Sequence, residues 1–190
     1  MAISDIDRKN ALAAAMEAEL ASLEERGVRM AGNAYSPVLL VKGDLNEDER
    51  SGGVLLAGAD GRALRAALSA IGWAPEDFCA LAAVAGAEAA GAPAGPLPAP
   101  LFREALEALD PEAVILLDEA AAAAMREAYA ADLALIDDFD TATLKPGLVA
   151  HVLGRRALAL GGFEAALADS HKKQVVWAYL KQFPPLGAPY

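Results

Sequence analysis

A group of acidic side chains follows a short apolar run early in the sequence, and these carboxylates could support two kinds of chemistry. The run 38–41 is closed by Gly43, and Asp44 comes directly after that glycine. One carboxylate in such a place can activate a water molecule or stabilise a developing positive charge. Several together can hold a hard divalent cation, and a solvated acidic loop is the third interpretation. The acids concerned are Asp44, Glu47, Asp48 and Glu49.

The two histidines of the chain are further candidates for acid–base chemistry near neutral pH. His151 lies in the apolar segment 148–153, which favours a buried structural histidine over a catalytic one. His171 stands beside two lysines at the start of a predicted helix, where we expect it to be solvated. Neither occurs in a nucleophile motif or with the spacing of metal-binding histidines, so no metal site is expected from them.

Basic residues gather late in the sequence and could form a patch that binds phosphate or nucleic acid. Trp177 could stack on a base beside such a patch, although a tryptophan in an amphipathic helix more often belongs to the core. The patch would act against the net charge of the whole chain, -11, which repels nucleic acid and anionic membranes at long range. The candidates for the patch are Arg155, Arg156, Lys172 and Lys173.

Length and composition bound the class of protein. A chain of 190 residues is long enough to bury one core, so we expect a single domain spanning 1–190. No apolar run approaches the ~20 residues that cross a bilayer. The acidic start lacks the basic and apolar parts of a signal peptide, so we expect a cytoplasmic protein. The single cysteine, Cys79, cannot alone hold an iron–sulfur cluster, and no cofactor is expected.

The elements that must position these side chains follow from apolar runs and helical spacing. Continuous apolar runs predict buried strands at 38–41, 78–84 and 113–117, and the segment 155–160, which ends at two glycines, is expected to be the last strand. Helical patterns lie between or after them, at 60–71, 101–109, 119–129 and 163–183. This alternation predicts an α/β fold, a three-layer α/β/α sandwich with a central parallel sheet of about four strands.

Two further segments flank the predicted core, which spans 37–183. Residues 5–26 show the spacing of an amphipathic helix, whose apolar stripe predicts packing on the sheet; the alternative is a partner-binding helix. The tail 184–190 follows two prolines and is expected to be loosely held. The stripe consists of Leu12, Met16, Leu20 and Leu23.

Several segments, in order along the chain, resemble the uracil-DNA glycosylase superfamily, most closely its family 4 branch. Residues 38–46 resemble a strand of that branch that ends in a Gly-Glu-Ala-Pro-Gly type motif. Residues 53–64 are similar to its Gly-Arg-Pro-Phe-Val-Gly-Arg-Ala-Gly type segment, which opens a helix. Residues 111–117 are similar to its next core strand, and 171–177 to the start of its last helix. The resemblance implies the same α/β/α fold.

The resemblance also implies a ligand site at the carboxyl end of the sheet, where open α/β sheets bind their ligands. Asp44 corresponds to the catalytic carboxylate of the family and is one methylene shorter. The other candidate ligand-binding residues are Gly43, Leu45, Asn46, Leu56, Gly58, Gly162 and Phe163.

Most groups that base excision requires are absent from the corresponding positions. Leu56 replaces the stacking aromatic, Ala82 replaces the base-reading amide, and no imidazole occurs at 161–164. The cluster cysteines are absent as well. We therefore expect a non-catalytic relative that acts as a binding or interaction module in DNA maintenance, with a protein or a nucleic acid as its partner. The alternative is a divergent DNA glycosylase or nucleotide-acting hydrolase that uses Asp44 as its carboxylate.

Overall fold

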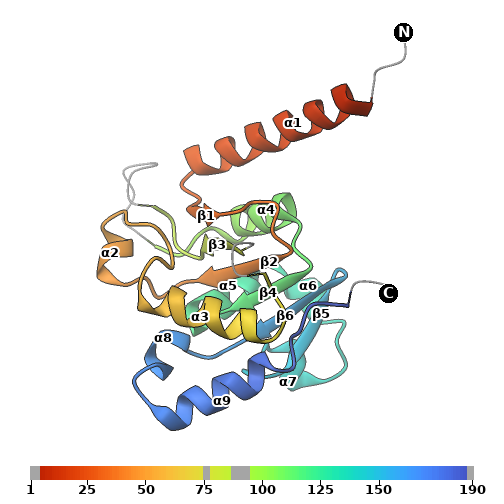
Figure 1. Ribbon diagram of the computed structural model, residues 1–190. Coiled ribbons are helices and arrows are strands. Elements are labelled where there is room, and N and C mark those ends of the chain that lie inside the picture. Colours follow the sequence, from red (N-terminus) through yellow and green to blue (C-terminus); the bar gives the residue numbers. More distant parts are fainter. Residues whose placement is uncertain (1–4, 75–77, 87–94, 188–190) are drawn as a thin grey trace.

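A computed structural model describes residues 5–74, 78–86 and 95–187, and a sheet lies at its centre (Figure 1). Within these ranges the sheet has six strands, in the order β1-β3-β2-β4-β6-β5. The inner strands are parallel, and the edge strands β1 and β5 are antiparallel to their neighbours. The strands are β1 Met30–Gly32, β2 Val38–Lys42, β3 Phe78–Ala82, β4 Ala113–Leu116, β5 Val149–Val152 and β6 Arg155–Ala159.

Helices cover both faces of the sheet, so the predicted three-layer α/β/α class is confirmed. Helices α4 and α5 contribute to the core on one face, and α3 and α9 to the core on the other. Short helices occupy several connections (Figure 1). The helices are α1 Asp5–Glu25, α2 Glu47–Arg50, α3 Ala59–Ala70, α4 Ala99–Leu109, α5 Glu119–Ala128, α6 Ala130–Leu133, α7 Phe139–Ala142, α8 Phe163–Ala166 and α9 Ser170–Leu180.

Strand β2 lies in the middle of the sheet and contributes to both halves of the core. Leu39 and Val41 pack with α4 and α5, whereas Val38 and Leu40 pack with α3 and α9. This alternation is the one expected for a strand covered on both faces. Because β2 pairs with β3 on one side and β4 on the other, its carboxyl end opens at the centre of one sheet edge.

The inner strands agree with the predicted runs to within one or two residues, whereas the edge strands were not predicted. Strand β1 has only three residues, and β5 alternates between buried and exposed side chains. The helix predicted at 163–183 is two helices, α8 and α9. Asp169 separates them, because its carboxylate accepts hydrogen bonds from the backbone N–H groups of His171 and Lys172 and so caps a new helix.

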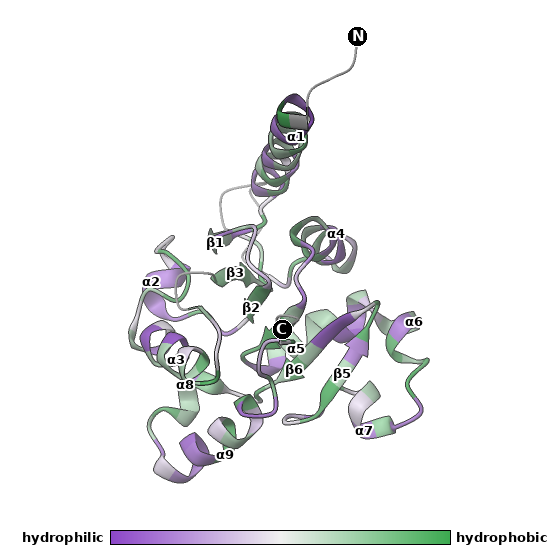
Figure 2. Ribbon diagram, turned by 45° about the vertical axis from the view of Figure 1, so that its right-hand side comes forward, coloured by the Kyte–Doolittle hydropathy of each residue, from purple (hydrophilic) through white to green (hydrophobic). Residues whose placement is uncertain are grey.

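Helix α1 projects from the body of the molecule instead of packing on the sheet, so that prediction is wrong (Figures 1 and 2). Only its carboxyl end is anchored: Leu23 is fully buried, and Leu20 packs against the same core. Beyond this end, Arg26 donates two hydrogen bonds to Glu104 of α4. The outer apolar residues are exposed, with Leu12 at 64% and Ile6 at 70%.

The start of the tail is attached to the body, unlike the loosely held tail that the sequence predicted. The Pro184 carbonyl accepts a hydrogen bond from Arg156, and the Leu186 amide donates one to Glu112. The segment 85–100 consists almost wholly of alanine, glycine and proline, which predicts a long surface loop. Residues 87–94 of this segment, and residues 188–190, lie outside the described ranges. Among the described helices, none has both the length and the apolar character needed to cross a bilayer.

Candidate functional site

A pocket of about 400 Å³ opens at the carboxyl end of β2, where the candidate site was expected. It lies between the segment after β2, the start of α3, the end of β4 and helix α8. Its wall combines apolar side chains with four carboxylates and two cations. The lining residues are Lys42, Asp44, Leu45, Asn46, Arg50, Asp60, Leu117, Asp118, Gly162, Phe163, Glu164 and Ala165.

Five of the predicted site residues line this pocket. The φ angle of Gly162 is 120°, a conformation that favours glycine, and it lets the chain turn after β6. The Gly162 and Phe163 amides then both donate hydrogen bonds to the Leu117 carbonyl at the end of β4. This turn places Phe163 against the end of the neighbouring strand. The five residues are Asp44, Leu45, Asn46, Gly162 and Phe163.

Three other predicted site residues, Gly43, Leu56 and Gly58, do not line the pocket. A Cβ atom on Gly43 would lie 2.5 Å from the Ala120 Cβ, so this position serves the close contact between β2 and α5. Leu56 is 1% exposed and belongs to the core, where it offers no surface to a ligand. Gly58 is the N-cap of α3. Asp60, the first residue of the helix predicted at 60–71, lies inside the first turn of α3.

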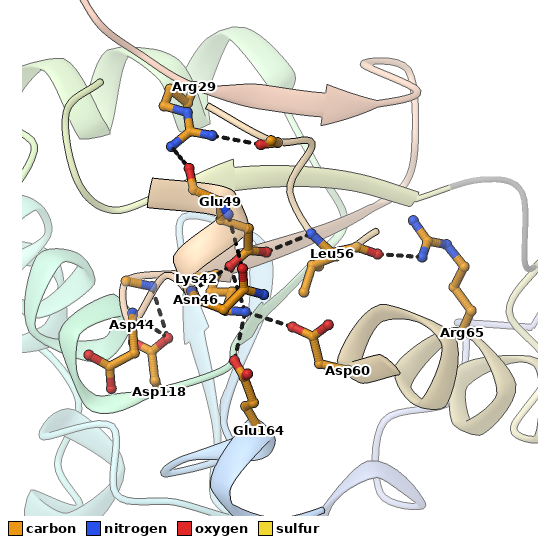
Figure 3. A network of polar contacts seen from close by, with 12 residues as sticks. Arg29, Lys42, Asp44, Asn46, Glu49, Leu56, Asp60, Arg65, Asp118 and Glu164 are labelled. Atoms are coloured by element: carbon orange, nitrogen blue, oxygen red, sulfur yellow. Dashed lines mark hydrogen bonds and ion pairs between the residues drawn. The ribbon is translucent and has the colours of Figure 1, made fainter. Parts of the chain in front are cut away.

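A buried lysine that the sequence analysis did not single out holds one side of the pocket together (Figure 3). Lys42 ends strand β2, and its side chain is 3% exposed. Its Nζ atom lies 2.6 Å from Oδ2 of Asp60, 2.8 Å from Oε2 of Glu49 and 2.9 Å from Oε2 of Glu164. One ammonium group therefore joins β2 to helices α2, α3 and α8.

The Lys42 ammonium remains charged because its carboxylate partners outweigh its burial. Loss of hydration would by itself lower the pKa of this group. Its hydrogen bonds to Asp60, Glu164 and Glu49 act in the opposite direction and raise the pKa above the ordinary lysine value. Lys42 is therefore a structural cation and cannot serve as a neutral base near pH 7.

The acidic segment after β2 is not a fully solvated loop. Residues 47–50 form the single turn of α2, and Asn46 caps it by accepting a hydrogen bond from the Glu49 amide. The Glu49 carboxylate is 2% exposed, and it accepts hydrogen bonds from the Asn46 and Leu56 amides as well as pairing with Lys42. Glu47 and Asp48 are exposed. Within the described ranges, no three histidine, cysteine or acidic side chains are placed to bind a metal ion.

Asp118 is a second buried acid at the pocket, and it fixes the backbone around Asp44. Its Oδ2 atom accepts hydrogen bonds of 2.9 Å from the amides of Gly43 and Asp44. Its Oδ1 atom accepts one of 2.8 Å from the Ala121 amide and so caps α5. This carboxylate is bonded to the protein through both of its oxygens and positions the chain after β2.

Asp44, the amide group of Asn46 and the exposed guanidinium of Arg50 are polar groups that the pocket leaves open to a ligand. The Asp44 carboxylate points away from the Lys42 network (Figure 3), and it has no hydrogen bond or ion pair with any described residue. Asn46 uses its Oδ1 atom to cap α2, while its amide nitrogen has no acceptor among the described residues. A buried aromatic ring, Phe163, lies in the same wall.

The predicted cationic patch is not a single surface, because its two arginines are buried. Arg155 pairs with Glu107 and Asp110 at 2.8 and 2.7 Å. Arg156 pairs with Glu112 at 3.1 Å, and its guanidinium carbon lies 4.7 Å from the centre of the Phe183 ring. Both arginines begin β6, at the amino end of the parallel strands.

The two lysines of the predicted patch lie elsewhere and are exposed. Lys172 and Lys173 are in the first turn of α9. Lys172 lines a second hollow, of about 580 Å³, next to Gly161 and Gly162 at the carboxyl end of β6. The four basic residues therefore divide between the two ends of one strand.

The histidines and Trp177 also lie outside the pocket. His151 is exposed on β5, opposite Arg156, so the expectation of a buried structural histidine is wrong. His171 is exposed in α9, as predicted, and lines the second hollow. Trp177 is 36% exposed, so it is not a core residue.

No protein-family model matches the chain, and no curated protein matches it significantly.

Proposed function

We propose that this protein is a non-catalytic relative of the uracil-DNA glycosylases, which keeps their scaffold as a binding or interaction module in DNA maintenance. One observation carries the proposal: the acids around the pocket are mostly committed to the protein itself. Glu49 and Asp60 are paired with Lys42, and Asp118 is bonded to three backbone amides. Such groups stabilise a fold and are not available to activate a water molecule.

The set of groups left in the pocket differs from the one that ordinary base excision uses. That reaction needs a carboxylate, a group that reads the base, an aromatic ring that stacks on it and a donor for the departing anion. Asp44, Asn46 and Phe163 could supply the first three functions. The fourth lacks the imidazole that the family uses, because neither histidine lies in the pocket; the lining offers the exposed guanidinium of Arg50 in its place.

The charge of the pocket also favours a partner other than a nucleic-acid strand. Its lining contains more carboxylates than cations, and the chain as a whole carries a net charge of -11. A DNA backbone approaching this edge of the sheet would meet repulsion from fixed charges of the same sign. We therefore favour a protein partner for the module.

The alternative, a divergent glycosylase or nucleotide-acting hydrolase, is favoured by a different observation. Asp44 carries a carboxylate with no partner among the described residues, and it lies in the wall of an open pocket. The pocket volume, about 400 Å³, falls within the range of small-molecule sites. An enzyme of this kind would depend on Asp44 and on no other acid of the pocket.

A single-turnover excision assay separates the two proposals. Uracil-containing single strands and mismatched duplexes are incubated at low salt with the wild-type protein, with Asp44→Asn and with Asp48→Asn. Asp48 is an exposed acid in the same segment that does not line the pocket, so its variant is the matched control. Binding of the same oligonucleotides is recorded by fluorescence anisotropy in the same samples.

We expect no excision by any of the three proteins, and weak binding that disappears as the salt concentration rises. Excision that persists in Asp48→Asn and disappears in Asp44→Asn would overturn the non-catalytic proposal and establish the hydrolase. Tight binding that resists salt would contradict the preference for a protein partner.

A further inference from the structure

The pocket at the carboxyl end of β2 carries more negative charge than its own cations neutralise. Four carboxylates and two cations line it, and Glu49, which pairs with Lys42, adds a further carboxylate next to the lining. Charges in a partly enclosed site interact more strongly than charges in bulk water. The pocket therefore attracts an occupant with positive charge and repels an anion.

Lys42 has no binding capacity left for a ligand. An ammonium group has three N–H donors, and those of Lys42 are used by Asp60, Glu49 and Glu164. Its single charge is thus shared among three carboxylates. A further cation in the pocket has to come from Arg50 or from another molecule.

Asp44 and Arg50 line the same pocket with opposite charges, yet they are not paired with each other. Both are exposed, and within the described ranges neither side chain has a hydrogen bond or an ion pair. The Asp44 carboxylate is therefore open to a cation from outside. The half-exposed Glu164 carboxylate uses Oε2 for Lys42 and leaves Oε1 for the same cation.

The apolar part of the lining suits the stem of a long basic side chain. Leu45, Leu117 and Phe163 are buried side chains of the pocket wall. Lysine and arginine pack their aliphatic stems along such surfaces while their charged ends stay near polar groups, and a cation close to an aromatic ring gains a further attraction. A metal ion has no such stem, and no three potential metal ligands are grouped in the described part of the chain. The lining is thus complementary to an aliphatic chain that ends in a cation.

We propose that the pocket receives a lysine or arginine side chain of the protein partner, with its stem against Phe163 and Leu117 and its cation beside Asp44. The inference rests on the proposed function, because it names the part of a partner protein that enters the pocket. Arg50 opposes the entry of this cation, since it is a positive charge of the same lining. Removing Asp44 and removing Arg50 should therefore have opposite effects on binding.

Titration of the isotope-labelled full chain with Nα-acetyl-lysine N-methylamide at low salt, followed by NMR, tests the proposal. Nα-acetyl-norleucine N-methylamide has the same stem without the ammonium and is the matched control probe. We expect saturable shifts at the backbone amides of Asp44, Asn46 and Phe163, and binding at least about fivefold tighter than that of the control probe. Equal binding of the two probes, or shifts confined to other acidic surfaces such as helix α1, would overturn the proposal.

Three variants test the sign of the interaction. Asp44→Asn should weaken binding of the lysine probe by roughly threefold or more. Asp48→Asn removes the same charge from an exposed position outside the lining and should leave binding nearly unchanged. Arg50→Gln should strengthen it. Weaker binding in Arg50→Gln, or equal losses in Asp44→Asn and Asp48→Asn, would overturn the insertion of a cation at Asp44.

The source of the cation and the proposed function are tested separately. n-Butylamine carries the same stem and cation without a backbone, so tighter binding of this amine than of the lysine probe would indicate a free amine and overturn a side-chain ligand. Absence of saturable binding by the lysine probe and by its arginine counterpart would overturn the inference and leave the non-catalytic proposal intact. Excision that depends on Asp44 would overturn the proposed function, whatever the titration gives.

Discussion

The ammonium nitrogen of Lys42 lies 2.6 Å from Oδ2 of Asp60, and the two side chains are only 3% and 4% exposed. This contact connects the carboxyl end of β2 to the first turn of α3. Glu49 from α2 and Glu164 from α8 complete the coordination of the same ammonium. The arrangement carries more negative than positive charge, so its stability depends on the single cation at its centre.

Replacing Lys42 by methionine should therefore destabilise the protein strongly. The change leaves the carboxylates of Glu49 and Asp60 buried without a counter-ion, and breaking a buried pair in this way typically costs about 3–5 kcal/mol. Urea unfolding at pH 7, followed by circular dichroism, measures the change in the free energy of unfolding.

Two variants serve as controls for the Lys42 prediction. Lys145→Met removes a lysine that is 60% exposed and pairs with Asp140, and it should change the free energy of unfolding far less than Lys42→Met does. Lys42→Met/Glu49→Gln/Asp60→Asn removes the buried charges together and should recover part of the loss. A Lys42→Met variant as stable as Lys145→Met would show that the network contributes little.

The protein should lose stability as the pH rises above about 9, because three buried groups have a raised pKa in the folded state and therefore stay protonated up to a higher pH than in the unfolded chain. Burial raises the pKa of the Cys79 thiol to about 11. Burial, followed by the hydrogen bond to Glu107, raises the pKa of Tyr129. The pKa of Lys42 is raised by its carboxylate partners, which outweigh its burial.

The sign of this pH dependence follows from linkage. In the unfolded chain the three groups lose their protons near their ordinary pKa values of 9.0, 10.0 and 10.5. Between these values and the raised ones the folded state binds more protons than the unfolded state, so stability falls as pH rises. Urea midpoints between pH 7 and pH 11 test this, and Tyr129→Phe should make the fall shallower. A midpoint that is constant up to pH 11 would contradict the prediction.

Asp118→Ala should destabilise the protein by about 2–4 kcal/mol, because it removes a helix cap and the acceptor of two further amides in one step. The amides of Gly43 and Asp44 would lose their partner, and so would the Ala121 amide at the start of α5. Urea unfolding measures the loss, and faster hydrogen exchange at Gly43 and Asp44 locates it.

The matched control for Asp118 is the exposed helix cap Asp138. Its carboxylate accepts hydrogen bonds from the amide and hydroxyl groups of Thr141 and from no other described residue. Asp138→Ala should therefore lower the free energy of unfolding by less than Asp118→Ala does, because it removes one exposed helix cap and no other contact. Equal losses in the two variants would mean that Asp118 caps α5 and does nothing more for the segment after β2.

The inner strands could be predicted from sequence because each contains an apolar run that is followed, directly or within two residues, by a glycine or an acid. The edge strands could not, since they lack this signal: β1 is three residues long, and β5 alternates, with His151 on its exposed side. The helical spacing of α1 was correct. Spacing alone, however, does not tell whether the stripe is covered by the same chain or by another molecule.

A candidate site at the end of β2 was predicted from the sequence, but whether that end of the sheet is open or filled was not, and the composition of the site was predicted only in part. A strand that leads into a cluster of acids indicates a site at the end of β2, and Asp44 lies there. Lys42 was missed as the centre of the site, although a lysine at the last position of a buried strand must find a counter-ion. Its partners could not be assigned, because Asp60 and Glu164 are distant in sequence and meet it only through the packing of α3 and α8.

Arg156 and Lys172, both predicted to belong to one cationic patch, should respond differently to substitution. Arg156 is 9% exposed at its side chain, lies over the Phe183 ring and donates a hydrogen bond to the Pro184 carbonyl. Arg156→Ala should lower the free energy of unfolding by about 1–3 kcal/mol, because it removes this packing and leaves the end of the chain less firmly held. Lys172→Ala, at an exposed position of α9, should change it by less than about 0.5 kcal/mol. Urea unfolding of the two variants measures both changes in the free energy of unfolding. Equally small changes in the two variants would mean that the contacts of Arg156 contribute no net stability.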